Sequence, residues 1–502
     1  MDIVKNGEWK ERGQEGILWL AINAKYSHTS LAVRYLRECV PGSEILELTI
    51  NHQLLAALGE IYERRVLGIA CYIWNIEMVK DLLRLLPAAL PDTIIVCGGP
   101  EVSYDTAAFF REFPMVDFVV RGEGEEAVVQ LIERLRAVKL DKARAAEVSR
   151  LVSLPGVAMR REDGSIDEST AVTVADFSQV PFAYREAEME PIKERILYYE
   201  TSRGCPFSCA YCLSCATAGV RFLPLARVFG ELDFFVRHDV RQVKFVDRTF
   251  NAKKSHFLPI LQYILALPQT VRTNFHFEVA IDYLDEDVLE TLAQMPRGRV
   301  QLEIGIQSTN EKTLQAVSRC NHWEQIAAHI RRILSFHNMH LHVDLIIGLP
   351  GEGMDSFARS FNDVYELHAD MLQLGFLKFL KGASMMQLVE PYRYAYMAMA
   401  PYEVLRSDAL TYGEIRWFHS FEDVFETYYN AGRCRHTADF LIKAQEHGDA
   451  FAFWKRFTDW WENHGYHKVG HATKDLYGLL RDFAGDAYGT AAVLLDNLLR
   501  FD

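Results

Sequence analysis

The chain has 502 residues, of which 49% are hydrophobic and 24% charged, and its formal net charge is −14. This apolar content can build large cores, which excludes an intrinsically disordered protein, and about three domains of ordinary size are expected. The sequence has no run of about 18 apolar residues, so no membrane span is predicted, and no apolar segment near its start, so no secretion signal is predicted. The negative charge argues against non-specific nucleic-acid binding.

Five short strand-like runs alternate with amphipathic segments in the first part of the chain. ILWLAI and VLGIACY are two of the runs, and SLAVRYLREC is one of the amphipathic segments. This alternation predicts a doubly wound, Rossmann-like parallel sheet in a domain at residues 1–140. Ligands of such sheets bind beyond the carboxyl ends of the strands, so the loops at those ends are candidate binding loops.

The next two regions differ in pattern. Residues 141–195 contain the turn signals Pro-Gly and Asp-Gly, which predict a hairpin followed by an extended linker. Residues 196–385 alternate again, with six strand-like runs separated by helical segments. Because six units are too few for an eight-stranded barrel, we expect a partial TIM-type barrel with its chemistry at the carboxyl ends of the strands.

The last region, residues 386–502, lacks strand alternation and is rich in aromatic residues. We expect a mostly helical domain that closes over the mouth or the bottom of the barrel. Two interpretations of its polar and aromatic side chains stay open, a substrate pocket and an ordinary core. The residues concerned are His419, Tyr428, Tyr429, Arg433 and His436.

Four of the nine cysteines, Cys205, Cys209, Cys212 and Cys215, lie within eleven residues, directly after the first strand of the six-unit region. The first three have CxxxCxxC spacing. Three thiolates can bind three irons of a [4Fe–4S] cluster and leave the fourth iron open for a chelating ligand. Zinc is the alternative, although zinc sites usually pair two CxxC motifs. Cys215 is expected to be a neighbouring thiol, with a redox or substrate-binding role as the alternative.

The segment from Arg203 to Cys212 resembles the signature of radical S-adenosylmethionine (SAM) enzymes, with Tyr211 at the aromatic position before the third cysteine. The resemblance implies that Cys205, Cys209 and Cys212 hold the cluster. It also implies that the open iron binds the amino and carboxylate groups of SAM, and that reduction cleaves the C5′–S bond to give a 5′-deoxyadenosyl radical.

Further polar residues follow or end strands of the predicted barrel. Asp247 in FVDRTF resembles the family position that holds the methionine amine, although the family's glycines are absent. Glu278 and Glu303 alternate with apolar neighbours, so we expect them to face the interior. There they either bind SAM or form an internal ion pair. The resemblance adds one position after the fourth strand and one after the fifth, Gln307 and Leu349. The residues assigned to SAM are then Tyr211, Asp247, Glu278, Glu303, Gln307 and Leu349.

Two glycine-containing loops, CGGPEVS and RGEGE, follow strands of the N-terminal sheet. Glycine is typical of places where a backbone approaches a ligand. In front of a radical SAM region, these loops resemble the cobalamin-binding class of that superfamily. The motif DxHxxG is absent, so we expect cobalamin without a histidine below cobalt. The expected contacts are Tyr72, Trp74, Asn75, Gly98, Gly99, Pro100, Glu101, Ser103, Gly122, Glu123, Gly124 and Glu125. Trp74 lying simply in the core is the alternative.

The leading hypothesis is a cobalamin-dependent radical SAM enzyme with three cofactors: a [4Fe–4S] cluster, SAM and cobalamin. We expect it to methylate an unactivated carbon or phosphorus centre of a small molecule or peptide, with an electron donor such as flavodoxin or ferredoxin, in the cytoplasm. The alternatives are oxidation, cyclisation, rearrangement or aminocarboxypropyl transfer with the same cofactors, and a cobalamin sensor. No catalytic residue is identified.

Overall fold

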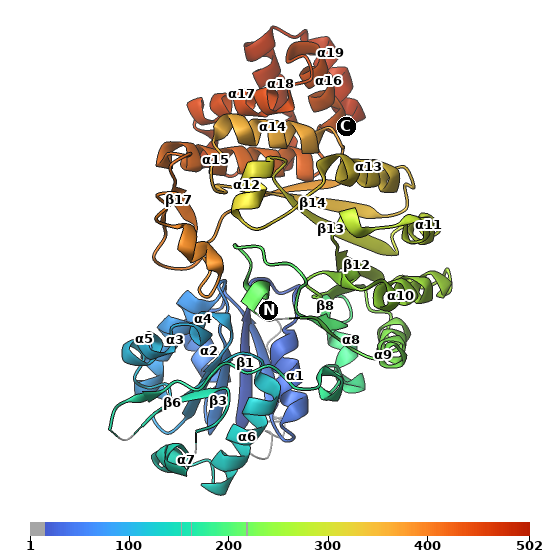
Figure 1. Cartoon of the computed structure of the whole chain (residues 1–502). Helices are drawn as coiled ribbons and strands as arrows, with labels where there is room; N and C mark the ends of the chain where they lie inside the picture. Colours follow the sequence, from blue (N-terminus) through green and yellow to red (C-terminus); the bar gives the residue numbers. More distant parts are fainter. Residues whose placement is uncertain (1–15, 152, 162, 217–218) are drawn as a thin grey trace, which may run out of the picture.

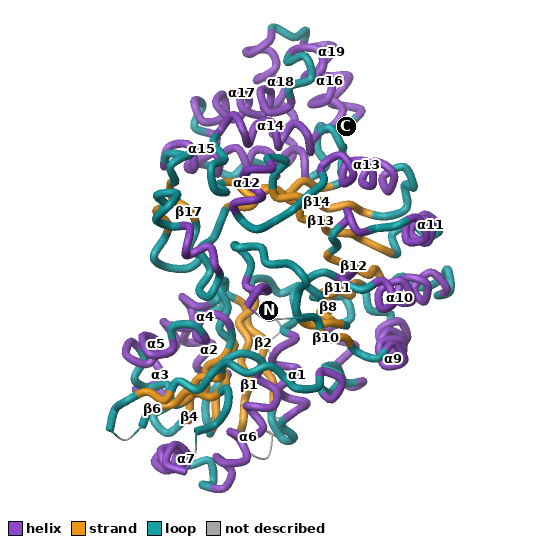
Figure 2. Tube along the Cα trace, viewed as in Figure 1, coloured by secondary structure: helices purple, strands orange, loops and turns teal. Residues whose placement is uncertain are grey.

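The computed structural model describes residues 16–151, 153–161, 163–216 and 219–502. Figure 1 shows an N-terminal sheet domain below, a second strand-rich domain above it, and the C-terminal helices at the far end. Figure 2 shows that strands form the centre of the two sheet domains and that loops lie where these domains meet. The predicted α/β fold class is confirmed. None of the described helices is long and apolar enough to cross a membrane.

The N-terminal domain is built on a seven-stranded sheet with the order β2-β1-β3-β4-β5-β6-β7. Strands β1 to β5 pair in parallel, and β6 and β7 extend one edge as an antiparallel hairpin. Every residue of β1 is buried, as expected for a central strand covered on both faces. The strands are β1 (Ile17–Asn23), β2 (Glu44–Thr49), β3 (Val66–Ala70), β4 (Ile94–Gly98), β5 (Phe118–Val120), β6 (Val157–Arg160) and β7 (Ile166–Asp167).

Helices cover both faces of this sheet. Apolar residues of α2, α3 and α5 form a core on one face, and those of α1, α6 and α7 form a second core on the other. The strand order reverses at β1 and β3, and ligands of such sheets bind beyond the carboxyl ends of the strands at this switch point. The helices are α1 (Leu31–Cys39), α2 (Leu54–Glu60), α3 (Ile76–Ala89), α4 (Pro100–Ser103), α5 (Thr106–Glu112), α6 (Gly124–Ala137) and α7 (Ala145–Leu151).

The predicted hairpin is present, but it is not separate from the N-terminal domain. Strand β6 pairs antiparallel with β5 and with β7, so the N-terminal sheet continues to Asp167. A domain boundary at residue 140 would therefore cut through this sheet. The chain then leads through α8 (Met189–Ile192) to the second domain.

The second domain is the predicted partial barrel, an open sheet of six parallel strands in the order β15-β14-β13-β12-β11-β8. The strands are β8 (Ile196–Tyr199), β11 (Gln242–Phe245), β12 (Asn274–Glu278), β13 (Val300–Gln307), β14 (His340–Ile347) and β15 (Met371–Phe376). The helices are α9 (Leu225–Arg237), α10 (Lys254–Ala266), α11 (Glu286–Ala293), α12 (Glu311–Ala316), α13 (Trp323–Leu334) and α14 (Met354–Tyr365).

The two faces of the barrel sheet differ in polarity. Along β13, buried apolar residues alternate with half-buried Gln301, Glu303, Gly305 and Gln307. The apolar set belongs to the large core shared with the surrounding helices. Because successive side chains point to opposite faces of a strand, the concave face carries the polar set.

The C-terminal helices pack on α14 and on the edge strand β15, not over the mouth or the bottom of the barrel as expected. The side chain of Asn430 accepts a hydrogen bond from the backbone N–H of Leu372 in β15 at 3.0 Å and donates one to its carbonyl at 2.9 Å. Such contacts cover a sheet edge whose backbone groups are otherwise unpaired. The helices are α15 (Tyr412–Phe425), a π-helical turn (Glu426–Asn430), α16 (Arg435–Gln445), α17 (Ala450–Asn463), α18 (Thr473–Tyr488) and α19 (Ala492–Phe501).

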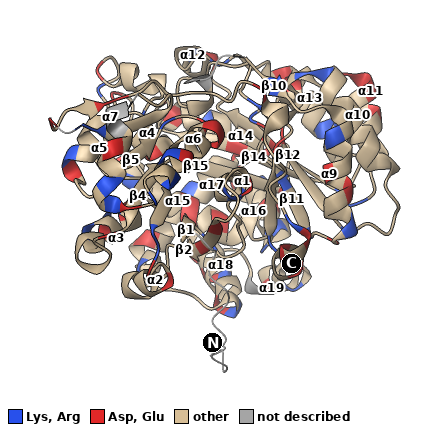
Figure 3. Ribbon diagram, turned by 90° about the horizontal axis from the view of Figure 1, so that it is seen from below, with Lys and Arg blue, Asp and Glu red and all other residues tan. Residues whose placement is uncertain are grey.

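Two of the aromatic residues of this region, Tyr428 and Tyr429, are buried. They belong to the core, which is one of the two interpretations left open for them. Between β15 and α15, the short pair β16 (Ala395–Tyr396) and β17 (Val404–Arg406) belongs to a segment that reaches back toward the N-terminal domain (Figure 1). In Figure 3, Lys and Arg residues are interspersed with Asp and Glu residues along the ribbon.

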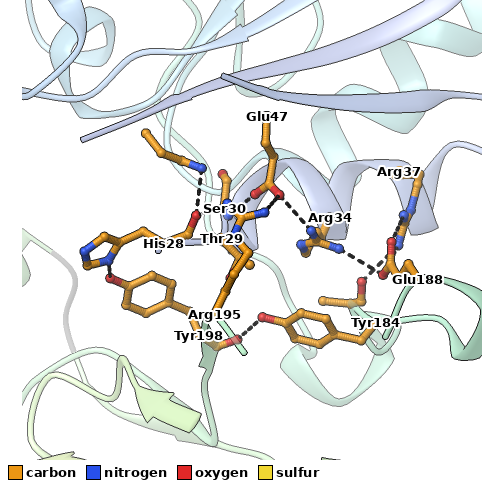
Figure 4. A network of polar contacts seen from close by, with 12 residues as sticks. His28, Thr29, Ser30, Arg34, Arg37, Glu47, Tyr184, Glu188, Arg195 and Tyr198 are labelled. Carbon is orange, nitrogen blue, oxygen red and sulfur yellow. Dashed lines mark hydrogen bonds and ion pairs between the residues drawn. The ribbon is translucent and has the colours of Figure 1, made fainter. Parts of the chain in front are cut away.

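A network of polar contacts joins the N-terminal sheet to the first barrel strand (Figure 4). Arg34 of α1 is 2% exposed and pairs with Glu47 of β2 and with Glu188, at 2.9 Å each. Beside it, the loop after β1 pairs with β8, because the N–H of Ile196 donates to the carbonyl of Ser27 at 2.8 Å. The carboxyl edge of the N-terminal sheet therefore lies against the barrel.

Candidate active site at the domain junction

The three cysteines of the CxxxCxxC motif share one loop at the carboxyl end of β8. The loop is closed by the antiparallel pair β9 (Ser202–Arg203) and β10 (Arg221–Phe222). At its start, Gly204 has a φ of +100°, and a Cβ there would lie 2.1 Å from the carbonyl oxygen of Gly219. This close approach requires glycine. The loop thus presents three thiols from one strand end, a donor set that fits a [4Fe–4S] cluster.

Hydrogen-bonding groups from other segments contact these thiols. The contacts are Thr249 Oγ1 with Cys205 Sγ at 3.4 Å, the Ser214 N–H with Cys212 Sγ at 3.4 Å, and the Arg319 guanidinium with Cys209 Sγ at 3.7 Å. Arg319 also donates to the hydroxyl of Tyr211 at 3.2 Å. Donors around thiolates stabilise their charge and tune a cluster. The side chain of Cys215 lies outside the described part of the chain, so its role stays a prediction.

The segment after β11 connects the second strand end to the cluster loop. Asp247 is fully buried and accepts three hydrogen bonds, from the N–H and hydroxyl of Thr201 at 2.8 and 2.6 Å and from the Ser202 hydroxyl at 2.7 Å. Burial raises its pKa, and these bonds oppose the rise. The carboxylate therefore braces the chain just before the cluster loop. A contact of Asp247 with the methionine amine stays a prediction. The carboxylate would have to accept that hydrogen bond in addition to those from Thr201 and Ser202.

The residue next to Asp247 is placed differently. Arg248 is exposed, and no ion pair with it is found among the described residues. Burial raises the pKa of Tyr72 in the N-terminal domain and that of Glu278 in the barrel, and the charge of Arg248 opposes both rises, so it acts on both sides of the domain junction. Arg248 is a cation at the meeting point of the two domains.

The two glutamates predicted to face the barrel interior have different surroundings. Glu303 lies 2.8 Å from Lys244 Nζ and 3.0 Å from His276 Nε2. Burial by itself raises the pKa of Glu303, but the contacts with His276 and Lys244 outweigh it and lower this pKa to about 2. Glu303 therefore forms an internal ion pair, which is one of the two interpretations left open for it.

Glu278 ends β12 beside Glu303. No hydrogen bond or ion pair of its carboxyl group is found in the described part of the chain. Burial, followed by the charge of Glu303, raises its pKa to about 7, against the lowering effect of Lys244 and Arg248. Glu278 is the glutamate of the two that remains open to a ligand.

The last two residues assigned to SAM lie at the ends of β13 and β14. Gln307 ends β13 with a φ of +72°, and its side-chain amide packs on Gly305, where a Cβ would lie 2.2 Å from Nε2. Leu349 is fully buried, and Tyr394 donates to the carbonyl of the preceding Gly348 at 2.8 Å. A contact of Leu349 with SAM stays a prediction.

At the switch point of the N-terminal sheet, two aromatic rings stack. The rings of Tyr72 and Trp74 are 4.4 Å apart and nearly parallel. Trp74 is 46% exposed and donates from Nε1 to the carbonyl of Ile22 at 3.1 Å. Asn75 is buried and bonds to the backbone of β1 and β3 through its side-chain amide. Trp74 is thus not a core residue, and the stack offers an apolar surface beyond β1 and β3, whereas Asn75 braces the loop.

Two glycines of the predicted cobalamin loops, Gly99 and Gly122, pack closely against the backbone of the protein. Gly99 and Gly122 have positive φ values of 114° and 82°. A Cβ on Gly99 would lie 2.4 Å from the carbonyl oxygen of Cys71, and one on Gly122 would lie 2.2 Å from that of Val172. Internal packing thus accounts for glycine at these two positions. Contacts of cobalamin with Gly98, Gly99, Gly122 and Gly124 stay predictions.

The carboxylates of these loops are engaged in joining domains. Arg203, just before the cluster loop, lies 2.6 Å from Glu125, 2.6 Å from Glu200 and 3.3 Å from Glu123. Arg221 pairs with Glu123 as well. The GEGE loop is thereby tied to both ends of the cluster loop. Glu123 and Glu125 serve this ionic joint, which limits their expected contact with cobalamin.

The other loop is tied to the segment before α15. Glu101 is 4% exposed and accepts a hydrogen bond from the Tyr402 hydroxyl at 2.6 Å. Pro100 begins α4, and the hydroxyl of Ser103 donates to the carbonyl of Gly99 at 2.8 Å. These contacts are internal, so a role of the three residues in cobalamin binding stays a prediction.

Two histidines lie beyond strand ends at this edge. His28 shares a hydrogen bond between Nδ1 and the Tyr198 hydroxyl of the barrel. Nδ1 of His52 accepts from the N–H of Thr49 at 3.0 Å. Nδ1 of each ring therefore has a partner within the protein, and the absence of a histidine below cobalt stays a prediction.

Sequence reasoning missed Arg203, Lys244, Arg319 and Tyr402. Each acts on a residue far away in the chain, such as Glu125 or Glu101, so no local pattern reveals the pairing. Arg203 had one available signal, since it stands directly beside the cysteine motif.

Three families match consecutive parts of the chain. Residues 17–132 match the B12 binding domain, residues 199–364 match the radical SAM superfamily, and residues 390–502 match a family described as a protein of unknown function (DUF4080).

Among curated proteins, the chain is 27% identical to the cobalamin-dependent radical SAM methyltransferase TokK of Streptomyces tokunonensis, over 74% of this chain and 56% of TokK. It is 28% identical to the 2-(S-pantetheinyl)-carbapenam-3-carboxylate methyltransferase of Streptantibioticus cattleyicolor, over 60% of this chain and 45% of that protein. The chain thus spans about half the length of these relatives.

A solved structure shares the fold. The radical SAM methyltransferase TsrM of Kitasatospora setae, with cobalamin and a [4Fe–4S] cluster bound, matches with a TM-score of 0.58 and 16% identity, over 76% of each chain.

Proposed function

Because the chain belongs to the cobalamin-binding radical SAM enzymes, we propose that it is a methyltransferase acting on a carbon or phosphorus centre of a small molecule or peptide. One observation carries this proposal. The carboxyl edge of the B12-binding sheet and that of the radical SAM sheet face each other, and Arg203 joins the GEGE loop to the cluster loop. When bound, the cluster with SAM supplies a 5′-deoxyadenosyl radical, and cobalamin supplies a methyl group.

In the barrel, Cys205, Cys209 and Cys212 would hold the cluster. Glu278 would accept hydrogen bonds from SAM or substrate, since its carboxyl group faces the concave side without a protein partner in the described residues. Arg248 would hold an anionic group between the domains. Tyr211, held by Arg319, would keep the loop in place beside SAM.

In the N-terminal domain, the stacked rings of Tyr72 and Trp74 would lie against the corrin at the switch point. These two rings would supply an apolar surface for the corrin and no nitrogen ligand for cobalt, since Trp74 Nε1 donates to the carbonyl of Ile22. The loops at Gly98–Ser103 and Gly122–Glu125 would contribute backbone groups, because their carboxylates pair with other parts of the protein.

The proposal includes a reducing partner. A [4Fe–4S] cluster of this kind needs a low-potential electron donor such as flavodoxin or ferredoxin, and a cytoplasmic location would provide it. TokK and TsrM are named as methyltransferases, which favours methyl transfer over the other outcomes of radical chemistry.

The test uses anaerobically reconstituted protein loaded with cobalamin, and SAM that carries a deuterated methyl group. We expect stoichiometric cluster and cobalt, deuterated methylcobalamin, and 5′-deoxyadenosine after reduction. The variant Cys205→Ala should lose 5′-deoxyadenosine, and the matched variant Cys320→Ala should keep it. Deoxyadenosine without labelled methylcobalamin would favour a non-methylating radical enzyme. Absence of both products would favour a cobalamin sensor.

A further inference from the structure

A cluster of titratable side chains on the concave face of the barrel is separate from the cysteine loop. One nitrogen of His342 and one carboxylate oxygen each of Glu303 and Asp344 lie within 4.8 Å of one another. Glu303 comes from β13, and the other two from β14. The register pairs Glu303 with His342, and Gly305 with Asp344, so the three side chains project from adjacent positions.

His342 and Asp344 contact each other as an ion pair. Nε2 of His342 and Oδ1 of Asp344 are 3.1 Å apart, and both atoms are buried with no partner besides each other among the described residues. Such atoms are costly to bury when they are unsatisfied. Ligand atoms that point at a common ion are close to one another without being aligned as donor and acceptor. At metal–ligand distances of about 2.1 Å, neighbouring ligands of an octahedral ion lie roughly 3 Å apart.

Neighbouring groups orient the third ligand. Lys244 Nζ and His276 Nε2 lie 2.8 and 3.0 Å from the same oxygen, Oε2 of Glu303. Contacts of this kind from neighbouring side chains orient a carboxylate ligand in metal sites. The charge of Lys244 offsets one of the two carboxylates, so the set keeps a net negative charge and still attracts a divalent cation.

We propose that Glu303, His342 and Asp344 form a binding site for a divalent first-row metal ion on the concave face of the barrel. The donors are nitrogen and oxygen without thiolate, which suits Mn²⁺ or Fe²⁺ and distinguishes this site from the cluster loop. Three protein ligands leave positions for water or for an oxygen atom of a bound molecule. The site assigns Glu303 to a metal rather than to SAM, and it does not depend on methyl transfer.

The test titrates the cluster-loaded, cobalamin-loaded protein with Mn²⁺ and follows free Mn²⁺ by its paramagnetic resonance signal. Mn²⁺ avoids confusion with cluster iron, and it binds thiolates poorly. We expect one Mn²⁺ per chain. His342→Ala and Asp344→Asn should each weaken binding about tenfold or more. Gln301→Ala changes the same face at a residue that accepts a hydrogen bond from Gln242 at 3.4 Å, and it should bind Mn²⁺ as the wild type does.

Cluster absorbance and circular dichroism check that each variant is folded, and His342→Gln replaces His342→Ala if the latter is not. No stoichiometric Mn²⁺ uptake by the wild type at about 1 mM would overturn the site. So would unchanged affinity in a folded His342 variant. Either result would mean that Lys244 and His276 already satisfy this group of side chains.

Discussion

The two parallel sheets present the same kind of edge, but they use its side chains in different ways. At the edge of the N-terminal sheet, Glu101, Glu123 and Glu125 are bound to residues of other domains. At the edge of the barrel, Glu278 has no such ion pair among the described residues, and the cysteines of one loop form a donor set for a cluster. Polar residues in loops at a ligand edge therefore serve either to bind a ligand or to hold the domain opposite. The partners, and not the motif, distinguish the two uses.

The largest effect is expected on the barrel side of this comparison. Replacing Cys205, Cys209 and Cys212 together by alanine should abolish the iron–sulfur absorbance, because no thiolate of the motif remains. Cys320→Ala removes an exposed cysteine elsewhere and should leave the absorbance intact. A triple variant that still binds a full complement of iron and sulfide would show that the ligands lie elsewhere.

The next effect is expected at the ionic joint. Arg203→Met would leave Glu123, Glu125 and Glu200 without this partner in a largely buried place, so the free energy of unfolding should fall by about 3–5 kcal/mol. Arg332→Met breaks an exposed ion pair with Glu286 and should cost at most about 1 kcal/mol. Denaturant unfolding measures both. If the two variants lose the same stability, the GEGE loop is not a structural joint.

A smaller effect concerns the pH dependence of stability through Glu278. Burial, followed by the charges of Glu303 and Asp344, raises the pKa of Glu278 from the usual 4.5 to about 7. Lys244 and Arg248 oppose this rise. The folded state therefore binds this proton more tightly, so stability is fully present below pH 4.5 and is lost as the pH rises through 7.

Glu278→Gln removes that loss and should stabilise the protein at pH 8 by up to about 3 kcal/mol, with little change at pH 4.5. Unfolding at the two pH values measures the difference. Glu286→Gln, at an exposed glutamate, serves as the control. Equal effects of Glu278→Gln at both pH values would mean that Glu278 is ionised without penalty and is paired.

The smallest effect is expected on the N-terminal edge. Trp74→Ala should weaken cobalamin binding by about 1 kcal/mol, roughly fivefold in Kd, because it removes one of two stacked rings. Its exposure means that stability should change little. Tyr62→Ala, at an exposed aromatic residue before the amino end of β3, is the matched control for equilibrium binding of cobalamin. Equal binding by both variants would place the corrin away from the stack.

The sequence predicted what depends on local periodicity. The five parallel strands, the open six-stranded barrel and the loop of three cysteines are all encoded in short segments, and the structure has them. The sequence could not predict that Glu123 pairs with Arg221 or that Asp247 accepts hydrogen bonds from Thr201. The packing of separate elements brings these partners together. The predicted position of the C-terminal helices was wrong for the same reason. Aromatic spacing indicates that a helix face is buried, but not which element covers it.

The central claim is that the two sheet edges form one site, with cobalamin and the cluster facing each other. The most direct measurement is the paramagnetic resonance signal of Co(II) in the loaded enzyme, recorded with the cluster oxidised and then reduced. We predict that reduction of the cluster speeds the relaxation of the Co(II) signal through spin coupling. A Co(II) signal whose relaxation is the same in both states would place the cofactors apart and contradict the account.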